Sequence, residues 1–363
     1  MMYCYRITGI TLRSCYELPS FAAFVCDPEK ADVTLEGTDD LPEPGEDRIS
    51  GTFAHRRISD GWFFHMPGID RQGLFAGGDY TRLRLLGMQG NVVSGVAEQF
   101  VRIALECALV RKGYITLHSS AIGIDGEAYA FCGPSGIGKS TRADIWMDAF
   151  KAERISGDRP MIRVSPPEVY GVPWDGKEKC FRNVRFPLKA IFDVRRSDSV
   201  YIRAMSFSQR RKLLLRQCFL PMWDTETAAV QMANIIRLAA GAEILRIFCG
   251  KTEEDARMLR EDFRKGRILK EEPDMKAKPG FVLRNVMDEH ILMPTGDNVG
   301  VFKGAVLLNN VAAMVWEKLQ NPVSREDLLR AVLDRFDVEE AVASADLDRL
   351  LRDMKEKGMI EDD

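Results

Sequence analysis

Residues 128–141 read Ala-Tyr-Ala-Phe-Cys-Gly-Pro-Ser-Gly-Ile-Gly-Lys-Ser-Thr. The first five residues form a short apolar run that predicts a β-strand, and residues 142–147 continue with helical spacing. Between them lies a glycine-rich turn that ends in Gly-Lys-Ser-Thr. A strand, a glycine-rich turn and a helix in this order are what a phosphate-binding loop requires.

The residue types of this loop suit a nucleotide. Glycines let backbone N–H groups approach phosphate oxygens, and the N-terminus of the new helix favours an anion. Lys139 would reach the β- and γ-phosphates of ATP, and the Ser140 hydroxyl would bind Mg²⁺. The expected nucleotide-binding residues are Gly133, Ser135, Gly136, Ile137, Gly138, Lys139, Ser140 and Thr141. The alternative is an ordinary turn between a strand and a helix.

The composition of the whole chain is that of a globular protein, with 363 residues, of which 45% are apolar and 29% charged. This length predicts two or three domains. The formal net charge of −3 gives no electrostatic case for a nucleic acid or a membrane partner. No long apolar run occurs and the first residues do not resemble a signal peptide, so a cytoplasmic location is expected.

Cysteine and histidine spacings give no sign of a metal site. The eight cysteines include no C-x-x-C pair, so reduced and mostly buried thiols are expected. The four histidines are too dispersed to suggest zinc. The sequence leaves a homo-oligomer open.

Residues 1–92 predict a β-rich region. An acidic stretch with two prolines, 39–47, is typical of a solvated loop, and His65 is expected in the core among aromatic residues. Four apolar runs are typical of strands: 3–12, 20–25, 61–66 and 81–86.

His118 is a candidate for contact with substrate or phosphate. A buried helix is predicted over 93–111 and a strand over 114–118. The Asp-Gly pair at 125–126 predicts a hairpin, which brings His118 close to the strand of the glycine-rich loop. An unremarkable histidine on a strand is about as plausible.

Asp158 is a candidate for metal binding and for catalysis. Residues 152–164 predict a strand, a tight acidic turn and a second strand. We expect the strand 154–156 to lie beside the loop strand, so that Asp158 holds Mg²⁺ or takes a proton from an attacking hydroxyl. The alternative is that Asp158 only stabilises the turn.

Two further segments are weaker candidates. Residues 169–178 predict a mobile loop over the site, in which Lys177 would contact phosphate and Glu178 metal or substrate; a plain surface loop is about as plausible. Asp193 ends a predicted strand over 187–194, and the arginines after it favour a solvated strand end.

The rest of the chain predicts helices, a linker and a separate module. Helices are expected at 208–220, 225–240 and 253–265, with a strand at 243–249. Residues 266–280 are typical of a linker. The last module predicts a hairpin of strands 282–293 and 299–308, then three helices: the first capped by Asn310, the second by Ser324, and the third over 338–357. This winged-helix-like module is acidic, which favours peptide docking over DNA binding.

Residues 112–250 resemble the HPr kinase/phosphorylase family. The resemblance rests on Leu-His-Ser-Ser-Ala-Ile at 117–122, the glycine-rich stretch 133–141, and Ser-Gly-Asp-Arg-Pro at 156–160. It implies an HPr kinase-like P-loop core in an α/β fold, with His118 near the phosphates and Asp158 as the base toward a serine hydroxyl. Gly157 replaces the first acid of the family's acidic pair, which argues against bifunctional kinase/phosphorylase activity. The loop Gly-Val-Pro-Trp at 171–174 also departs from the family's signature, which makes HPr an unexpected substrate.

Residues 282–360 are similar to the PqqD family, through Leu-Asn-Asn-Val-Ala-Ala-Met-Val-Trp at 308–316. PqqD-like modules bind leader segments of ribosomally made precursor peptides, so the resemblance implies a peptide partner.

Four parts are therefore expected: 1–92, β-rich; 93–265, P-loop kinase domain; 266–280, linker; and 281–363, PqqD-like module. The predicted function is an ATP- and Mg²⁺-dependent kinase that phosphorylates a hydroxyl on a recruited peptide. A small-molecule kinase and a non-catalytic ATP-binding scaffold are the alternatives.

Overall fold

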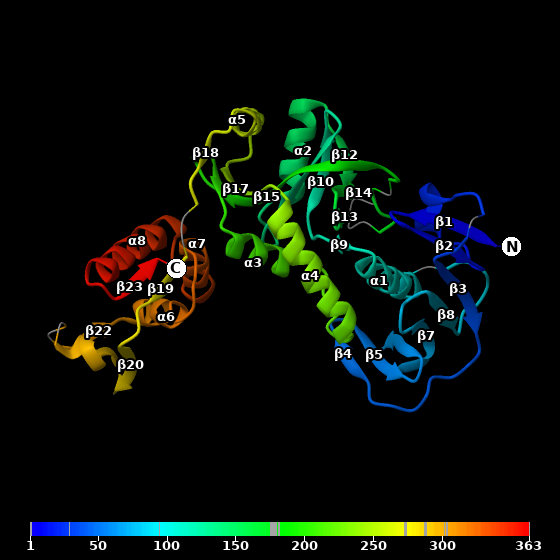
Figure 1. The fold of residues 1–363 in the computed structure, drawn as a ribbon, viewed down its shortest axis with the longest axis horizontal. Helices are drawn as coiled ribbons and strands as arrows, with labels where there is room; N and C mark the ends of the chain where they lie inside the picture. Colours follow the sequence, from blue (N-terminus) through cyan, green and yellow to red (C-terminus); the bar gives the residue numbers. More distant parts are fainter. Residues whose placement is uncertain are drawn as a thin grey trace. The chain divides into compact units, whose positions relative to one another are not determined.

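The computed structural model divides the chain into two compact units, Met1–Lys270 and Glu271–Asp363 (Figure 1). Helices and strands are mixed in both units, which confirms the predicted α/β class. None of the described helices is long and apolar enough to cross a membrane. The structure describes residues 2–28, 30–93, 95–174, 180, 182–271, 274–286, 289–300, 302 and 304–362.

The first unit begins with a β-sheet, as predicted. Its strand order is β1-β2-β3-β8-β7-β6-β5-β4, and only the β2–β3 and β3–β8 pairs among these are parallel. The strands are β1 (Tyr3–Ile7), β2 (Ile10–Ser14), β3 (Val33–Thr38), β4 (Arg48–Ser50), β5 (Phe53–Ile58), β6 (Gly61–Met66), β7 (Ile69–Gly77) and β8 (Arg82–Leu86).

Two predictions in this region are wrong. The run 3–12 forms two strands, because Thr8 adopts a left-handed conformation (φ 53°) and reverses the chain. The run 20–25 forms most of a 3₁₀ helix, η1 (Pro19–Phe24), because Pro19 fixes a helical φ at its start. His65 is buried as predicted, with Nε2 3.1 Å from Oδ1 of Asp47.

A second sheet forms the centre of the first unit. Its main path is β12-β10-β11-β15-β14-β13-β9, and β17 joins the other half of the long β15. The strands are β9 (Tyr114–Thr116), β10 (Ser120–Ile124), β11 (Glu127–Cys132), β12 (Glu153–Ser156), β13 (Met161–Val164), β14 (Pro167–Tyr170), β15 (Arg185–Arg196), β16 (Tyr201–Ala204), β17 (Ile244–Cys249) and β18 (Ile268–Leu269).

Side-chain alternation along β11 assigns the helices to the two faces of this sheet. Tyr129 and Phe131 point to the face where α2 (Lys139–Phe150) and α5 (Glu253–Arg264) pack, and the fully buried Trp146 of α2 lies against Phe131. Small residues, among them Ala130, point to the other face. That face packs against α3 (Phe207–Gln217) and α4 (Thr225–Gly241). Helix α1 (Gly95–Arg111) packs on β9 and α4, as Figure 1 shows.

The order of strands around the glycine-rich loop differs from the prediction. Strand β12 pairs with β10 and not with β11, whose neighbours are β10 and β15. The short Asp-Gly hairpin holds β10 next to β11, so the strand after α2 adds at the outer edge.

The predicted linker 266–280 contains two short strands. Ile268 and Leu269 pair with β16 in the first unit, whereas β19 (Met275–Ala277) pairs with β23 (Ile360–Asp362) in the second. Charge and proline content did not reveal these pairings, because the partners are distant in sequence.

The second unit has a three-stranded sheet and three α-helices. Its core gathers around Trp316, whose ring lies 5.8 Å from that of Phe281. The elements are β20 (Phe281–Val286), β21 (Glu289–Pro294), η2 (Gly296–Gly300), β22 (Val306–Leu308), α6 (Asn310–Lys318), α7 (Arg325–Arg335) and α8 (Glu340–Glu356).

Two details of this unit correct the prediction. Residues 282–293 are not one strand: β20 and β21 form an antiparallel pair, and β21 also pairs with β22. The cap of α6 is Asn309, whose Oδ1 accepts from the Ala312 N–H at 2.8 Å. Ser324 caps α7 as predicted, accepting from the Asp327 N–H at 3.1 Å.

A buried cluster around Asp224 joins the first sheet to the helical layer. The carboxylate caps α4 by accepting from the backbone N–H groups of Glu226 and Thr227. Tyr80 follows β7, and its hydroxyl donates to Oδ2 of Asp224 at 3.0 Å. Nη2 of Arg111, on α1, lies 3.4 Å from the same oxygen. One carboxylate therefore connects three parts of the first unit.

Replacing Asp224 with alanine is expected to lower the free energy of unfolding by about 2–4 kcal/mol, because it removes a helix cap and leaves the Tyr80 hydroxyl without its acceptor. Urea denaturation followed by circular dichroism measures the change. Asp198→Ala, at an exposed position, is the control and should stay within about 0.5 kcal/mol of wild type. Equal stability of Asp224→Ala and wild type would contradict the role of this cluster.

Candidate functional site

The glycine-rich turn connects β11 to α2, in the predicted order of strand, turn and helix. Gly133, Gly136 and Gly138 have φ values of 140°, 75° and 96°, which side chains other than glycine rarely adopt. A Cβ on Gly138 would also lie 2.7 Å from Nη1 of Arg142. The conformation therefore requires glycine where the N-terminal amides of α2 begin.

Lys139, the first residue of α2, folds back over the turn. Its Nζ donates to the carbonyl oxygens of Gly133 at 3.2 Å and Pro134 at 3.4 Å. Burial lowers the pKa of the ammonium group, although Cys132 and Asp158 act in the opposite direction. A lysine bonded to neutral carbonyls beside helix amides is a suitable binding group for phosphate, and Ser140 lies next to it on the first turn of α2.

The structure brings His118 and Asp158 together. Nε2 of His118 lies 3.6 Å from Oδ1 of Asp158, and both side chains are partly exposed. Burial lowers the pKa of His118, the nearby Lys139 and Arg159 lower it further, and Asp158 raises it. The imidazole is thus mainly neutral at pH 7.

The turn that carries Asp158 is fixed on both sides. The Ser156 hydroxyl donates to the Asp158 carbonyl at 2.8 Å, and the Leu117 N–H donates to the Pro160 carbonyl at 3.2 Å. These bonds place the turn beside the segment that holds His118. Asp158 reaches this position although β12 lies one strand farther from the loop than predicted.

The predicted mobile loop 169–178 is wrong for its first half. Residues up to Tyr170 belong to β14, and Val172 and Trp174 are buried in the core of the first unit. The Trp174 ring lies 6.4 Å from that of Phe21, a contact distant in sequence. Lys177 and Glu178 lie outside the described residues.

Asp193 corrects another prediction, because it is completely buried and not a solvated strand end. It pairs in register with Cys132 at the end of β11. Arg195 Nη1 donates to its Oδ1 at 2.6 Å, and Arg246 Nε donates to its Oδ2 at 3.0 Å. Two arginines thus compensate the buried charge next to the glycine-rich turn.

Arg142 and Arg196 contact the glycine-rich turn, and the sequence analysis did not predict these contacts. Arg142 is buried, and its Nη2 donates to the Cys249 carbonyl at the end of β17 at 3.0 Å. Arg196 donates to the Gly136 carbonyl at 2.7 Å. The arginine that follows Gly-Lys-Ser-Thr was visible in the sequence, but its partner lies more than one hundred residues away.

The metal predictions concern Ser140 and Asp158, and no structural observation tests them. Within the described ranges, no three His, Cys, Asp or Glu side chains gather in a group that could hold a metal ion. A hydroxyl and a single carboxylate suit Mg²⁺, which keeps several waters and binds phosphate oxygens of the nucleotide. The residues present therefore fit Mg-ATP.

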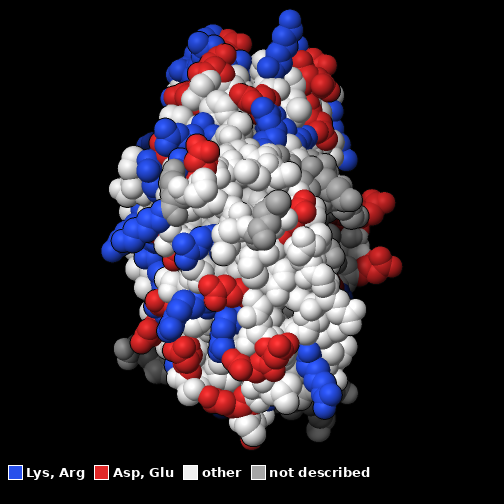
Figure 2. Space-filling view, turned by 90° about the vertical axis from the view of Figure 1, so that its right-hand side faces the viewer, with Lys and Arg blue, Asp and Glu red and all other residues white. Residues whose placement is uncertain are grey.

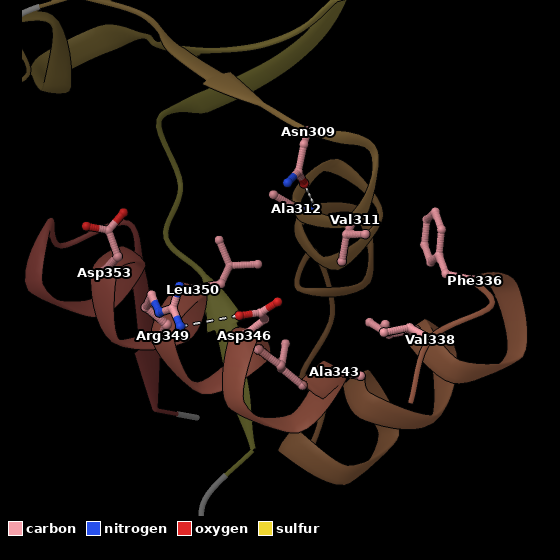
Figure 3. Close-up of a pocket in the computed structure, with 12 residues that line it drawn as sticks. Asn309, Val311, Ala312, Phe336, Val338, Ala343, Asp346, Arg349, Leu350 and Asp353 are labelled. Atoms are coloured by element: carbon pink, nitrogen blue, oxygen red, sulfur yellow. Dashed lines mark hydrogen bonds and ion pairs between the residues drawn. The ribbon is translucent and has the colours of Figure 1, made fainter. Parts of the chain in front are cut away.

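The second unit contains a groove of about 560 Å³ between α6 and α8 (Figure 3). Apolar side chains dominate its lining, among them Val311, Val338 and Leu350. Asp346 and Arg349 lie 3.4 Å apart on α8 and add a polar border. The groove begins at Asn309, directly after β22.

Strand β22 lies at the edge of its sheet, and Asn309, the residue that follows it, lines the groove. It pairs with β21 on one side, and its Leu307 is 65% exposed. An edge strand beside an apolar groove is the arrangement used to bind an extended peptide.

Charges on the face of the molecule shown in Figure 2 are mixed. Basic and acidic side chains lie interspersed, and a broad area between them carries neither. This face therefore presents no continuous patch of positive or of negative charge.

In nuclear magnetic resonance titrations without nucleotide or metal, the pKa of His118 is expected below its ordinary value of about 6.5. Lys139→Met should raise it, because a nearby cation is removed, and Asp158→Asn should lower it further. Lys189→Met, where the lysine pairs with Glu127 at 3.0 Å, is the control and should leave it unchanged. A His118 pKa above the ordinary value in wild type would contradict this geometry.

Comparison with known proteins gives a family match within the second unit. Residues 289–360 match the family described as Coenzyme PQQ synthesis protein D (PqqD). Two solved structures are similar to part of the chain. "TbiB1 in Complex with the TbiA(beta) Leader Peptide" is 21% identical, covering 24% of this chain and 94% of that chain (TM-score 0.21). "Lasso peptide synthetase B1 complexed with the leader peptide" is 20% identical, and the match covers 24% of this chain and 98% of that chain (TM-score 0.21).

No curated protein matches the chain. The resemblance of residues 112–250 to the HPr kinase family stays a prediction. The C-terminal region, residues 289–360, matches the PqqD family model.

Proposed function

We propose that the chain is an ATP- and Mg²⁺-dependent kinase that phosphorylates a hydroxyl, expected to be serine, on a peptide or small protein recruited by its PqqD domain. The observation that carries the proposal is the convergence of Lys139, His118 and Asp158. These residues come from three separate segments: His118 Nε2 lies 3.6 Å from Asp158 Oδ1, and Lys139 lies close enough to lower the pKa of His118. Such groups beside a phosphate-type loop are suited to phosphoryl transfer.

Each residue has a defined role in this proposal. Lys139 and the amides of the glycine-rich turn bind the β- and γ-phosphates, and the Ser140 hydroxyl contributes to the metal site. Mg-ATP supplies the phosphoryl group and a compensating divalent charge. Asp158 takes the proton of the acceptor hydroxyl. The hydroxyl oxygen of the acceptor bonds to the γ-phosphorus as the bond from that phosphorus to ADP breaks and ADP leaves. Neutral His118 orients Asp158 and the transferred group.

Peptide recognition is proposed for the groove of the second unit. The PqqD match covers this region, and the free edge of β22 can pair with an extended peptide through main-chain hydrogen bonds. Alternate side chains of that peptide would enter the apolar groove between α6 and α8. A recruited acceptor would then remain tethered to the chain that carries the transfer site, which raises its effective concentration.

A non-catalytic scaffold is the second candidate, and Gly157 favours it. A glycine occupies the position where the resemblance places a first acid, so one carboxylate remains for metal binding and proton transfer. Such a chain would bind ATP tightly and present the peptide to another enzyme.

Incubation with Mg-ATP and precursor peptides from neighbouring genes is expected to add the mass of one phosphate to a peptide. Asp158→Asn should slow this gain roughly 100-fold or more, because it removes the base. Lys139→Met should slow it by a similar factor of about 100, because phosphate stabilisation is lost. Intact-mass spectrometry over time measures both.

Two exposed substitutions serve as controls for these variants. Asp198→Asn and Lys189→Met change the same residue types away from the turn and should keep the wild-type rate. A phosphate gain that persists in Lys139→Met and Asp158→Asn would refute the assigned site. Tight ATP binding without any gain would favour the scaffold.

Leu350→Glu in the full chain is expected to weaken binding of a fluorescent leader peptide by about tenfold or more, because it places a charge in an apolar groove. Val342→Glu, on the exposed face of the same helix and outside the groove, is the control. Fluorescence anisotropy measures both affinities. Equal binding by Leu350→Glu and wild type would exclude this groove as the peptide site.

A further inference from the structure

Arg159 lies at the transfer site in a backbone conformation that is unusual for arginine. Its φ is 59°, in the left-handed region that favours glycine. The bonds of Ser156 to the Asp158 carbonyl and of Leu117 to the Pro160 carbonyl fix the chain on both sides of it. The surrounding structure therefore holds Arg159 in a costly conformation, as occurs at binding and catalytic sites.

The guanidinium of Arg159 belongs to the cluster of His118 and Asp158. Its Nε lies 3.8 Å from Oδ2 of Asp158, while His118 approaches the other oxygen, Oδ1, at 3.6 Å. The Arg159 side chain is 40% exposed, so a ligand can reach it. Lys139 and Arg159 both lower the pKa of His118.

We infer that Arg159 binds the terminal phosphoryl group of the nucleotide. The inference rests on the proposed function and adds one residue to its site. A guanidinium presents two parallel N–H groups that match two phosphoryl oxygens, which the single ammonium of Lys139 cannot do.

Isothermal titration of the full chain with Mg²⁺ and either AMP-PNP or ADP tests this assignment. AMP-PNP carries a third phosphoryl group that is not transferred, and ADP lacks it. Arg159→Gln should weaken AMP-PNP binding roughly 10- to 100-fold, as expected for charge-assisted hydrogen bonds, and change ADP binding less than about twofold. Arg159→Lys should be intermediate, because lysine keeps the charge and loses the paired N–H groups.

Arg163→Gln is the matched control and should bind both nucleotides as wild type does, because Arg163 follows on β13 and pairs with Glu168 at 2.7 Å.

The outcomes separate this inference from the kinase proposal. Three results would overturn the inference. The Arg159→Gln variant could bind AMP-PNP as tightly as wild type does, it could lose affinity for AMP-PNP and ADP equally, or the wild-type chain could bind neither nucleotide. Arg159-dependent discrimination of AMP-PNP from ADP without phosphate transfer to any peptide would contradict the kinase and support the inference.

Discussion

The parallel pairing of β11 with β15 is the constraint on which the first unit depends. This pair places the end of β11 against Asp193 and brings the Gly133 backbone close to Val194, where a Cβ would lie 3.3 Å from the carbonyl oxygen. The strand must stop there and turn, and the glycines allow it to do so with its amides directed outward. Because β15 also pairs with β17, the end of β17 lies within reach of Arg142. The turn is thereby held from the sheet side and from the helix side.

The sequence predicted the local parts of this arrangement well. The glycine spacing and the apolar strand before it indicated the turn between β11 and α2, and the Asp-Gly pair indicated the β10–β11 hairpin. Both signals lie within a few residues of the structure that they specify. His118 and Asp158 were each predicted to lie near the glycine-rich loop, and in the structure His118 Nε2 lies 3.6 Å from Asp158 Oδ1.

Features that depend on distant partners could not be predicted. Asp193 was misread because Arg195 suggested solvent, whereas Arg246, fifty-three residues away, makes burial possible. Trp174 was assigned to an exposed loop, yet it packs on Phe21 of the first sheet. Arg159 was part of a quoted motif, but its left-handed backbone and its approach to the Asp158 carboxylate arise in a turn that contacts between separate elements hold in place. Composition and periodicity carry no record of such contacts.

The shortness of β22 has a consequence for aggregation. An unpaired strand edge can join any extended chain, including a second copy of the protein or an unfolding neighbour. With only Val306–Leu308 in the strand, few main-chain hydrogen bonds are available to an incoming segment. A segment without side chains that fit the adjacent groove would therefore be held too weakly to nucleate a larger sheet, and the short edge protects the chain in the absence of its partner.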